Sequence, residues 1–269
     1  MSRPMKYAFM SFSTPTLSLA ETLDAARSYG YAAIEPRLDA DHSHGIEVGT
    51  SATQRQAIRR QVADTGIELC CLATSLSYAD PARTQDMLAQ SRERIDLAAD
   101  LGVPMLRVFG GKMGAGLQRQ QAIDLVAQTL SQAAERAAER GVTLCVETHD
   151  DWCDPEHMAA VMAGADHPSV AVNWDIMHPV RAAGVTMDQA FQALQPWIRH
   201  VHIHDGGGEQ LAFAPIGEGP IDHRRALQLL LPMDYAGYIS GEWIGWEAYA
   251  VHLPRELATM RGYENELST

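Results

Sequence analysis

The chain has 269 residues, a mass of 29.4 kDa and a formal net charge of -13 at pH 7. This length suffices for one large α/β domain, and a hydrophobic content of 46% is typical of soluble proteins. The acidic charge argues against a nucleic-acid partner or an anionic membrane surface, because both would repel it. The polar first residues, the lack of a long apolar stretch and four cysteines without a CxxC pair predict a cytoplasmic protein with reduced thiols.

A helical pattern that ends at a glycine, followed at once by a short apolar run, recurs along the chain. The glycines are Gly30, Gly66, Gly102 and Gly141, spaced 36, 36 and 39 residues apart. Strands are predicted at 7–12, 32–35, 68–73, 105–109, 143–147, 171–175, 200–204 and 238–242, with helices at 18–29, 52–65, 86–101, 119–140, 155–164, 187–195, 222–231 and 254–262. This alternation favours one (β/α)₈ barrel domain over residues 1–269 rather than an open doubly wound sheet.

Four of the later strands carry polar residues on one face. Because strand side chains alternate between faces, residues of one parity share a side. Barrel interiors are normally filled by branched apolar residues, and barrel active sites lie at the C-terminal strand ends. The polar rows therefore predict a functional site; they are Thr143, Cys145 and Glu147; Ala171, Asn173 and Asp175; His200, His202 and His204; and Tyr238, Ser240 and Glu242.

The motifs around these residues are Val146-Glu-Thr-His149, Asn173-Trp-Asp-Ile-Met-His178, Arg199-His-Val-His-Ile-His-Asp205, Gly217-Glu-Gly-Pro-Ile-Asp222 and Gly237-Tyr-Ile-Ser-Gly-Glu-Trp243. The ordered set resembles the sugar phosphate isomerase/epimerase family with the xylose isomerase-like barrel. That family includes ketose 3-epimerases, inosose dehydratases and some 3-dehydroshikimate dehydratases. Each motif is weak alone, but together they extend the resemblance over nearly the whole chain.

The resemblance implies one divalent metal ion held by Glu147, Asp175, His202 and Glu242. Three carboxylates and one imidazole form a mostly oxygen site, which suits Mn²⁺ first, and Mg²⁺ or Co²⁺, better than a thiolate-type zinc site. Zinc stays open, because the general order of affinities places it above manganese. The alternative is a set of ion pairs inside the barrel mouth, but convergent carboxylates without a cation would repel one another.

The resemblance also implies a reaction. A metal ion that chelates the oxygens of an α-hydroxy ketone makes the neighbouring C–H more acidic and stabilises an enediolate. Glu147 and Glu242 lie on different strands, so one is expected to remove the proton and the other to deliver it. This favours an isomerase or epimerase acting on a ketose or a related, including cyclic, polyol ketone. A dehydratase of the inosose or 3-dehydroshikimate type is the alternative, because it needs the same metal and a base.

Five further residues are predicted to contact substrate. In relatives the histidine at the position of His178 contacts substrate. Many relatives carry a lysine at the position of His204, which favours a substrate contact there. His149 is a candidate base, particularly in a dehydratase. Arg181 is either a clamp for an anionic or polyol substrate or an exposed loop residue. Glu35 ends the second strand and is expected to bind a substrate hydroxyl.

Other polar residues have more ordinary interpretations. His200 is expected to be a hydrogen-bonded core residue, and Arg107 to pair with Glu35 or another acid. His42 and His44 are expected to be solvated loop histidines rather than metal ligands. Gly206-Gly-Gly208 is expected to form a flexible turn rather than a loop that binds a phosphate.

Two rival functions are disfavoured. A non-catalytic sugar-binding barrel would not need both candidate proton-transfer glutamates, Glu147 and Glu242. Apurinic endonucleases of this fold carry histidines at the ends of the third and fourth strands, but residues 72–76 and 108–112 contain none. The oligomeric state stays open, with a homodimer or a homotetramer both compatible with the sequence.

Overall fold

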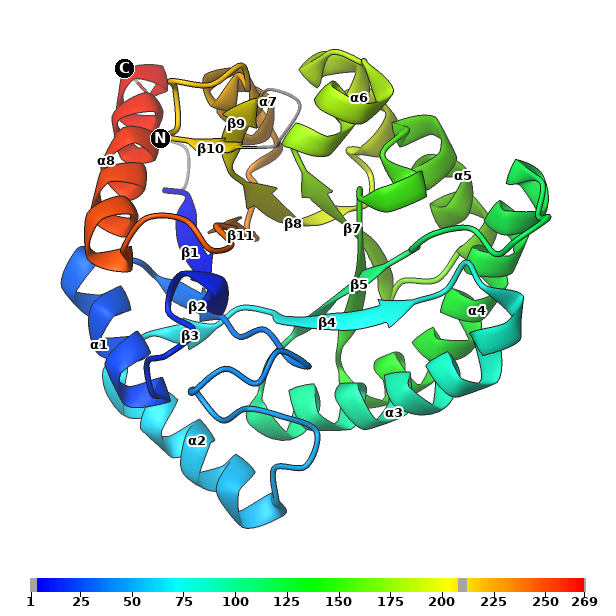
Figure 1. Cartoon of the computed structure of the whole chain (residues 1–269), viewed down its shortest axis with the longest axis horizontal. Helices are drawn as coiled ribbons and strands as arrows, with labels where there is room; N and C mark the ends of the chain where they lie inside the picture. The colour runs from blue at the N-terminus through cyan, green and yellow to red at the C-terminus, as the bar shows by residue number, and fades with distance from the viewer. Residues whose placement is uncertain (1–3, 208–211, 269) are drawn as a thin grey trace.

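Parallel strands form the wall of a barrel, and helices surround it in the computed structural model, which describes residues 4–207 and 212–268 (Figure 1). The strands follow the order β3-β2-β1-β11-β8-β7-β6-β5-β4. This arrangement confirms the predicted (β/α)₈ barrel. The strands are β1 (Lys6–Met10), β2 (Ala33–Glu35), β3 (Glu68–Leu69), β4 (Leu72–Ser77), β5 (Met105–Phe109), β6 (Thr143–Glu147), β7 (Val170–Asp175), β8 (Ile198–Ile203) and β11 (Tyr238–Gly241).

The predicted third strand is divided into β3 and β4, and this division closes the barrel. β3 pairs with β2, whereas β4 pairs with β5 on the other side. The backbone N–H of Leu38 donates to the carbonyl of Ala73 at 2.8 Å, and the N–H of Ala73 donates to the carbonyl of Pro36 at 2.9 Å. The chain after β2 therefore joins the two ends of the sheet.

Glycines in the left-handed conformation end four of the helices, at Gly30, Gly66, Gly102 and Gly141, as the recurring pattern predicts. The last helix starts five residues earlier than expected, so that Pro254 lies inside it rather than at its start. The helices are α1 (Leu19–Tyr29), α2 (Ala52–Thr65), α3 (Thr84–Leu101), α4 (Arg119–Arg140), α5 (Pro155–Ala165), α6 (Met187–Leu194), α7 (His223–Leu230) and α8 (Tyr249–Leu267).

Mostly small apolar side chains, with Met105 and Tyr238 as the larger members, fill the N-terminal half of the barrel interior and leave the C-terminal half to polar groups. The buried apolar set inside the barrel is Ala8, Ala33, Cys70, Cys71, Met105, Cys145, Ala171 and Tyr238. A second and larger core lies between the strands and the surrounding helices. The polar strand ends therefore lie on top of this packed apolar layer.

A short antiparallel hairpin, β9 (Asp205–Gly207) with β10 (Ala212–Ala214), follows β8 at the barrel mouth. Gly206 pairs with Phe213, and a Cβ at Gly206 would lie 2.5 Å from the carbonyl oxygen of Ala212. The expected flexible turn is therefore wrong for Gly206 and Gly207, which lie in β9, and at Gly206 only glycine permits this close approach. Gly208 lies outside the described residues. In the described part of the chain, no helix has the length and apolar character needed to cross a membrane.

Candidate metal centre

Four buried polar residues meet at the C-terminal mouth of the barrel. Glu147 ends β6, Asp175 ends β7, His202 lies near the end of β8, and Glu242 follows β11. One potential ligand atom of each lies within 4.8 Å of those of the other three. The register brings Asp175 beside His202, and β8 lies between β7 and β11. The structure thus brings together the residues of the predicted metal site, called below the four-residue cluster.

Glu147 forms a buried ion pair. Arg107 Nε lies 3.0 Å from Glu147 Oε2, and Arg107 Nη1 also donates to the carbonyl of Thr74 at 2.9 Å. Burial opposes ionisation of Glu147, but the charges of Arg107 and His202 outweigh it and lower the pKa to about 2. Arg107 therefore pairs with an acid inside the mouth, as expected, and that acid is Glu147.

Asp175 is held by hydrogen bonds to both carboxylate oxygens. Its Oδ1 accepts from the backbone N–H of Met177 at 2.8 Å and of His178 at 3.3 Å, and its Oδ2 accepts from His204 Nε2 at 2.8 Å. Burial opposes ionisation, but the charges of His204 and His178 outweigh it and lower the pKa of Asp175. Asp175 is consequently a fixed, ionised oxygen donor.

His202 presents one ring nitrogen to the other members of the cluster. Its Nδ1 lies 3.1 Å from Glu242 Oε2 and 3.6 Å from Glu147 Oε1. Burial disfavours the charged ring, but the carboxylates of Glu35 and Glu147 outweigh it and raise the pKa of His202 well above its usual value. The fourth member, Glu242, has the most exposed side chain of the four, at 11%.

The buried polar atoms of this cluster fit the coordination of a divalent cation. Within the described residues, His202 Nδ1 and both carboxylate oxygens of Glu147 are buried and make no hydrogen bond, and of these atoms Glu147 Oε2 lies in the ion pair with Arg107. Buried polar groups are nearly always satisfied, and three carboxylates at this separation repel one another. An oxygen-binding divalent ion would satisfy these donor atoms and neutralise the charge.

Glu35 lies deeper than the sequence suggested. It is fully buried, and its carboxylate accepts from His200 Nε2 at 2.9 Å and from His202 Nε2 at 3.1 and 3.2 Å. Both of its oxygens face histidine rings inside the barrel, and its predicted contact with a substrate hydroxyl stays a prediction. His200 is buried and hydrogen-bonded, as a core residue should be.

Three histidines form a row beside the four-residue cluster. The ring centroids of His149 and His178 are 4.6 Å apart, and those of His178 and His204 are 5.6 Å apart. Burial disfavours a charge on His149, but a hydrogen bond to Asp150 and the charge of Glu147 outweigh it and raise its pKa to about 9. All three rings lie near enough to the cluster to meet a bound molecule, and their predicted substrate contacts stay predictions.

Arg181 lies in η4 (Pro179–Ala183), a short π-helical segment after β7. Its guanidinium Nη1 is 3.8 Å from Met177 Sδ, and the residue is half-buried. Its predicted clamping of a substrate stays a prediction.

The loop histidines differ from the solvated pair that the sequence suggested. His44 is buried, and its Nδ1 accepts from the backbone N–H of Ile46 at 3.0 Å. His42 Nδ1 lies 2.9 Å from Ser11 Oγ. The expectation of solvated histidines is wrong for His44, because the buried Ile46 draws this loop against the core.

Two residues with structural roles at the site escaped the sequence analysis. Thr148 Oγ1 accepts from the backbone N–H of Asp175 and donates to its carbonyl, both at 3.0 Å, which fixes the end of β7 to the end of β6. The buried Asp205 carboxylate accepts from four backbone N–H groups and so shapes the loop before α7. The four donors to Asp205 are Gly206, Gly217, Gly219 and Ile221. The sequence signals for Thr148 and Asp205 were the motifs that contain them.

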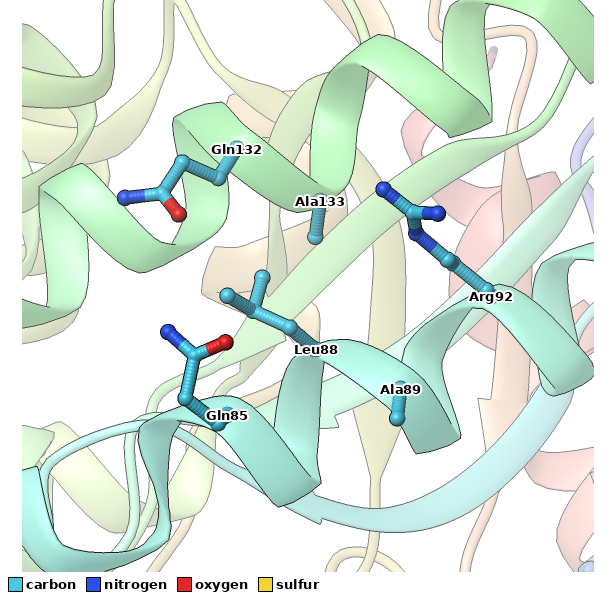
Figure 2. Close-up of a pocket in the computed structure, with 6 residues that line it drawn as sticks. All are labelled: Gln85, Leu88, Ala89, Arg92, Gln132 and Ala133. Carbon is cyan, nitrogen blue, oxygen red and sulfur yellow. The ribbon is translucent and has the colours of Figure 1, made fainter.

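A cavity of about 380 Å³ lies between α3 and α4 on the outside of the barrel (Figure 2). Its lining offers no carboxylate, imidazole or thiol. It therefore lacks the ligands that the four-residue cluster supplies; the lining residues are Gln85, Leu88, Ala89, Arg92, Gln132 and Ala133.

The fold and the site define a (β/α)₈ barrel with a candidate metal centre at the C-terminal ends of its strands. A model of the xylose isomerase-like TIM barrel family matches residues 23–260, and the chain belongs to this family.

Two relatives are similar over most of their length. The chain is 21% identical over 265 residues to a 3-dehydroshikimate dehydratase of Bacillus anthracis, covering 91% of this chain and 92% of that protein. It is 23% identical over 235 residues to the L-ribulose-5-phosphate 3-epimerase UlaE of Escherichia coli, covering 83% and 81%. Both relatives are named as enzymes, one a dehydratase and the other an epimerase.

Two solved structures share the fold. The IOLI protein with a bound zinc atom has a TM-score of 0.81 at 16% identity, with 98% of each chain covered. A xylose isomerase-like TIM barrel protein from Mycobacterium smegmatis in complex with magnesium has a TM-score of 0.73 at 18% identity, with 98% of each chain covered.

Proposed function

We propose that the protein is a divalent-metal-dependent isomerase or epimerase that moves a proton at the carbon next to the carbonyl of a ketose or related polyol ketone. The observation that carries the proposal is the convergence of three carboxylates and one imidazole within 4.8 Å at the barrel mouth. A bound divalent cation would polarise the carbonyl and hydroxyl oxygens of such a substrate and make the neighbouring C–H more acidic. The oxygen-rich donor set favours Mn²⁺, with Mg²⁺, Co²⁺ and Zn²⁺ as alternatives.

The two glutamates of the cluster differ in what they can do. Glu147 is buried against Arg107, and its lowered pKa makes it an ionised ligand in the resting enzyme and a weak base. Glu242 has the more exposed side chain, and its Oε2 lies 3.1 Å from His202 Nδ1. We therefore propose Glu242 as the group that removes the substrate proton, with Glu147 on another strand as the second and weaker proton carrier.

The histidine row supplies the substrate contacts in this proposal. His149, His178 and His204 offer ring N–H donors and acceptors beside the cluster, and His178 and His149 are partly exposed. Imidazoles of this kind can orient several hydroxyl groups of a polyol. They would hold the reacting carbon of the substrate near Glu242.

A dehydratase is the second candidate, and one relative and one residue favour it. The similarity to the 3-dehydroshikimate dehydratase extends over 91% of the chain. His149 is partly exposed at the mouth, and its Nδ1 lies 3.2 Å from Asp150 Oδ2. This histidine would donate a proton to a departing hydroxyl group in an elimination.

The test is an incubation of the metal-loaded enzyme in D₂O with ketoses, keto-inositols and 3-dehydroshikimate, followed by NMR. Deuterium at the carbon beside the carbonyl supports the isomerase or epimerase, and a new alkene supports the dehydratase. Glu242→Gln should abolish the exchange in a folded protein, whereas the matched change Glu135→Gln, at an exposed position of α4, should not. Undiminished exchange in Glu242→Gln would remove Glu242 from the mechanism.

A further inference from the structure

Glu35 is a buried carboxylate bound to two histidines from the opposite half of the sequence. It comes from β2, and its partners His200 and His202 come from β8, 165 and 167 residues further along the chain. A buried carboxylate is costly unless hydrogen bonds compensate it, and two ring N–H groups do so here.

The contact with Glu35 determines which nitrogen of His202 is free. Both oxygens of Glu35 lie within 3.2 Å of His202 Nε2, and a carboxylate that faces two histidine rings accepts from both, so the ring proton of His202 that faces Glu35 is on Nε2. In the neutral ring the lone pair is then on Nδ1, the atom that lies 3.1 Å from Glu242 Oε2 and has no hydrogen-bond partner. We infer that Glu35 is a positioning residue that fixes this tautomer and presents His202 Nδ1 to the metal ion of the proposed function.

His200 holds Glu35 in place from a second direction. Its Nε2 donates to Glu35 Oε2 at 2.9 Å, and its ring packs against that of His202 edge to face, with centroids 5.2 Å apart. With two donors on one carboxylate, neither the carboxylate nor the His202 ring can rotate freely. A carboxylate behind a ligating histidine also makes the imidazole a stronger donor to the metal.

A deeper cation site is the competing explanation for the same residues. Glu35, Cys70 and His200 place one donor atom each within 4.8 Å of one another. The Cys70 thiol, however, lies 3.4 Å from the carbonyl of Ile34, to which it donates, and burial raises its pKa well above the usual value. A protonated thiol is a poor ligand, and the positioning role predicts one bound metal ion for each chain rather than two.

The test measures metal affinity without substrate, so that it does not depend on the reaction. Metal-free wild type and Glu35→Gln are titrated with Co²⁺ or Mn²⁺ against a chromogenic chelator, with circular dichroism to verify folding. Loss of such an orienting partner typically weakens metal binding about 10- to 100-fold, which is the expected result. The matched control is Glu256→Gln, another buried glutamate, whose Oε2 accepts from the backbone N–H of Ile216 at 2.7 Å; its affinity should be unchanged.

A second readout does not require the variant to fold. In ¹H–¹⁵N spectra of the wild type loaded with Zn²⁺, His202 should carry its proton on Nε2 and bind the metal through Nδ1. The opposite tautomer would overturn the inference. So would an unchanged metal affinity in folded Glu35→Gln, or a metal content that falls from two ions per chain in the wild type to one in Glu35→Gln. If the wild type itself binds no divalent ion, the proposed function fails with it; if only the variant comparison fails, the proposed function stands.

Discussion

Replacing Arg107 with methionine should destabilise the metal-free protein and do so less when metal is bound. The change removes the guanidinium that lies 3.0 Å from Glu147 and its hydrogen bond to the carbonyl of Thr74. Lowering the pKa of Glu147 from its ordinary value of 4.5 to about 2 corresponds to about 3 kcal/mol in favour of the folded, ionised state, a contribution that Arg107 shares with His202. Breaking a buried ion pair typically costs about 3–5 kcal/mol, so we expect a loss of about 3 kcal/mol.

The assay is thermal unfolding of wild type and Arg107→Met, in EDTA and in saturating Mn²⁺. For a chain of this size, about 3 kcal/mol corresponds to a decrease in Tm of roughly 6–12 °C. Bound metal supplies positive charge to Glu147 in place of Arg107, so the difference should shrink with Mn²⁺. Because the folded pKa of Glu147 is depressed, the stabilisation is present above its ordinary pKa and is lost as the pH falls from 4.5 toward 2. An unchanged Tm in EDTA, or a decrease that metal does not reduce, would refute this reasoning.

Two further predictions concern metal binding and the loop before α7. Because the metal-free site raises the pKa of His202 well above 6.5, metal coordination at pH 7 should release a proton, and metal affinity should rise with pH. Calorimetry in buffers of different ionisation enthalpy should detect the released proton. A binding enthalpy that does not depend on the buffer would contradict the prediction. Gly219→Ala would bring a Cβ to 2.1 Å from Asp205 Oδ1, and it should lower the free energy of unfolding in urea by about 1–3 kcal/mol. The control Gly49→Ala, with open space around it, should be nearly neutral. Equal stabilities of the two variants would show that the loop before α7 shifts to accommodate the added Cβ.

The members of the four-residue cluster could be predicted from sequence because each depends on local rules. Strand parity and position at a strand end suffice for Glu147 and Asp175, and the barrel repeat brings such ends to one mouth. The contact of Glu35 with His202 depends on two strands 167 residues apart and on how far each side chain reaches, which no local pattern encodes. The burial of His44 likewise depends on the tertiary packing of its loop.

The break between β3 and β4 and the hairpin after β8 were also beyond the sequence. Closure of the barrel requires the third strand to change partners near Cys70, and periodicity does not reveal a change of partner. Consecutive glycines usually mark a turn, but here Gly206 and Gly207 pair with β10, and the absence of a side chain at Gly206 allows β10 to approach. In both places a tertiary contact overrides the local preference.

The most direct test of the metal centre is anomalous diffraction from crystals grown with Mn²⁺. We expect one strong peak at the barrel mouth, with Glu147, Asp175, Glu242 and Nδ1 of His202 at about 2.0–2.2 Å from it. A mouth without a peak, or a peak that these four residues do not coordinate, would contradict the account.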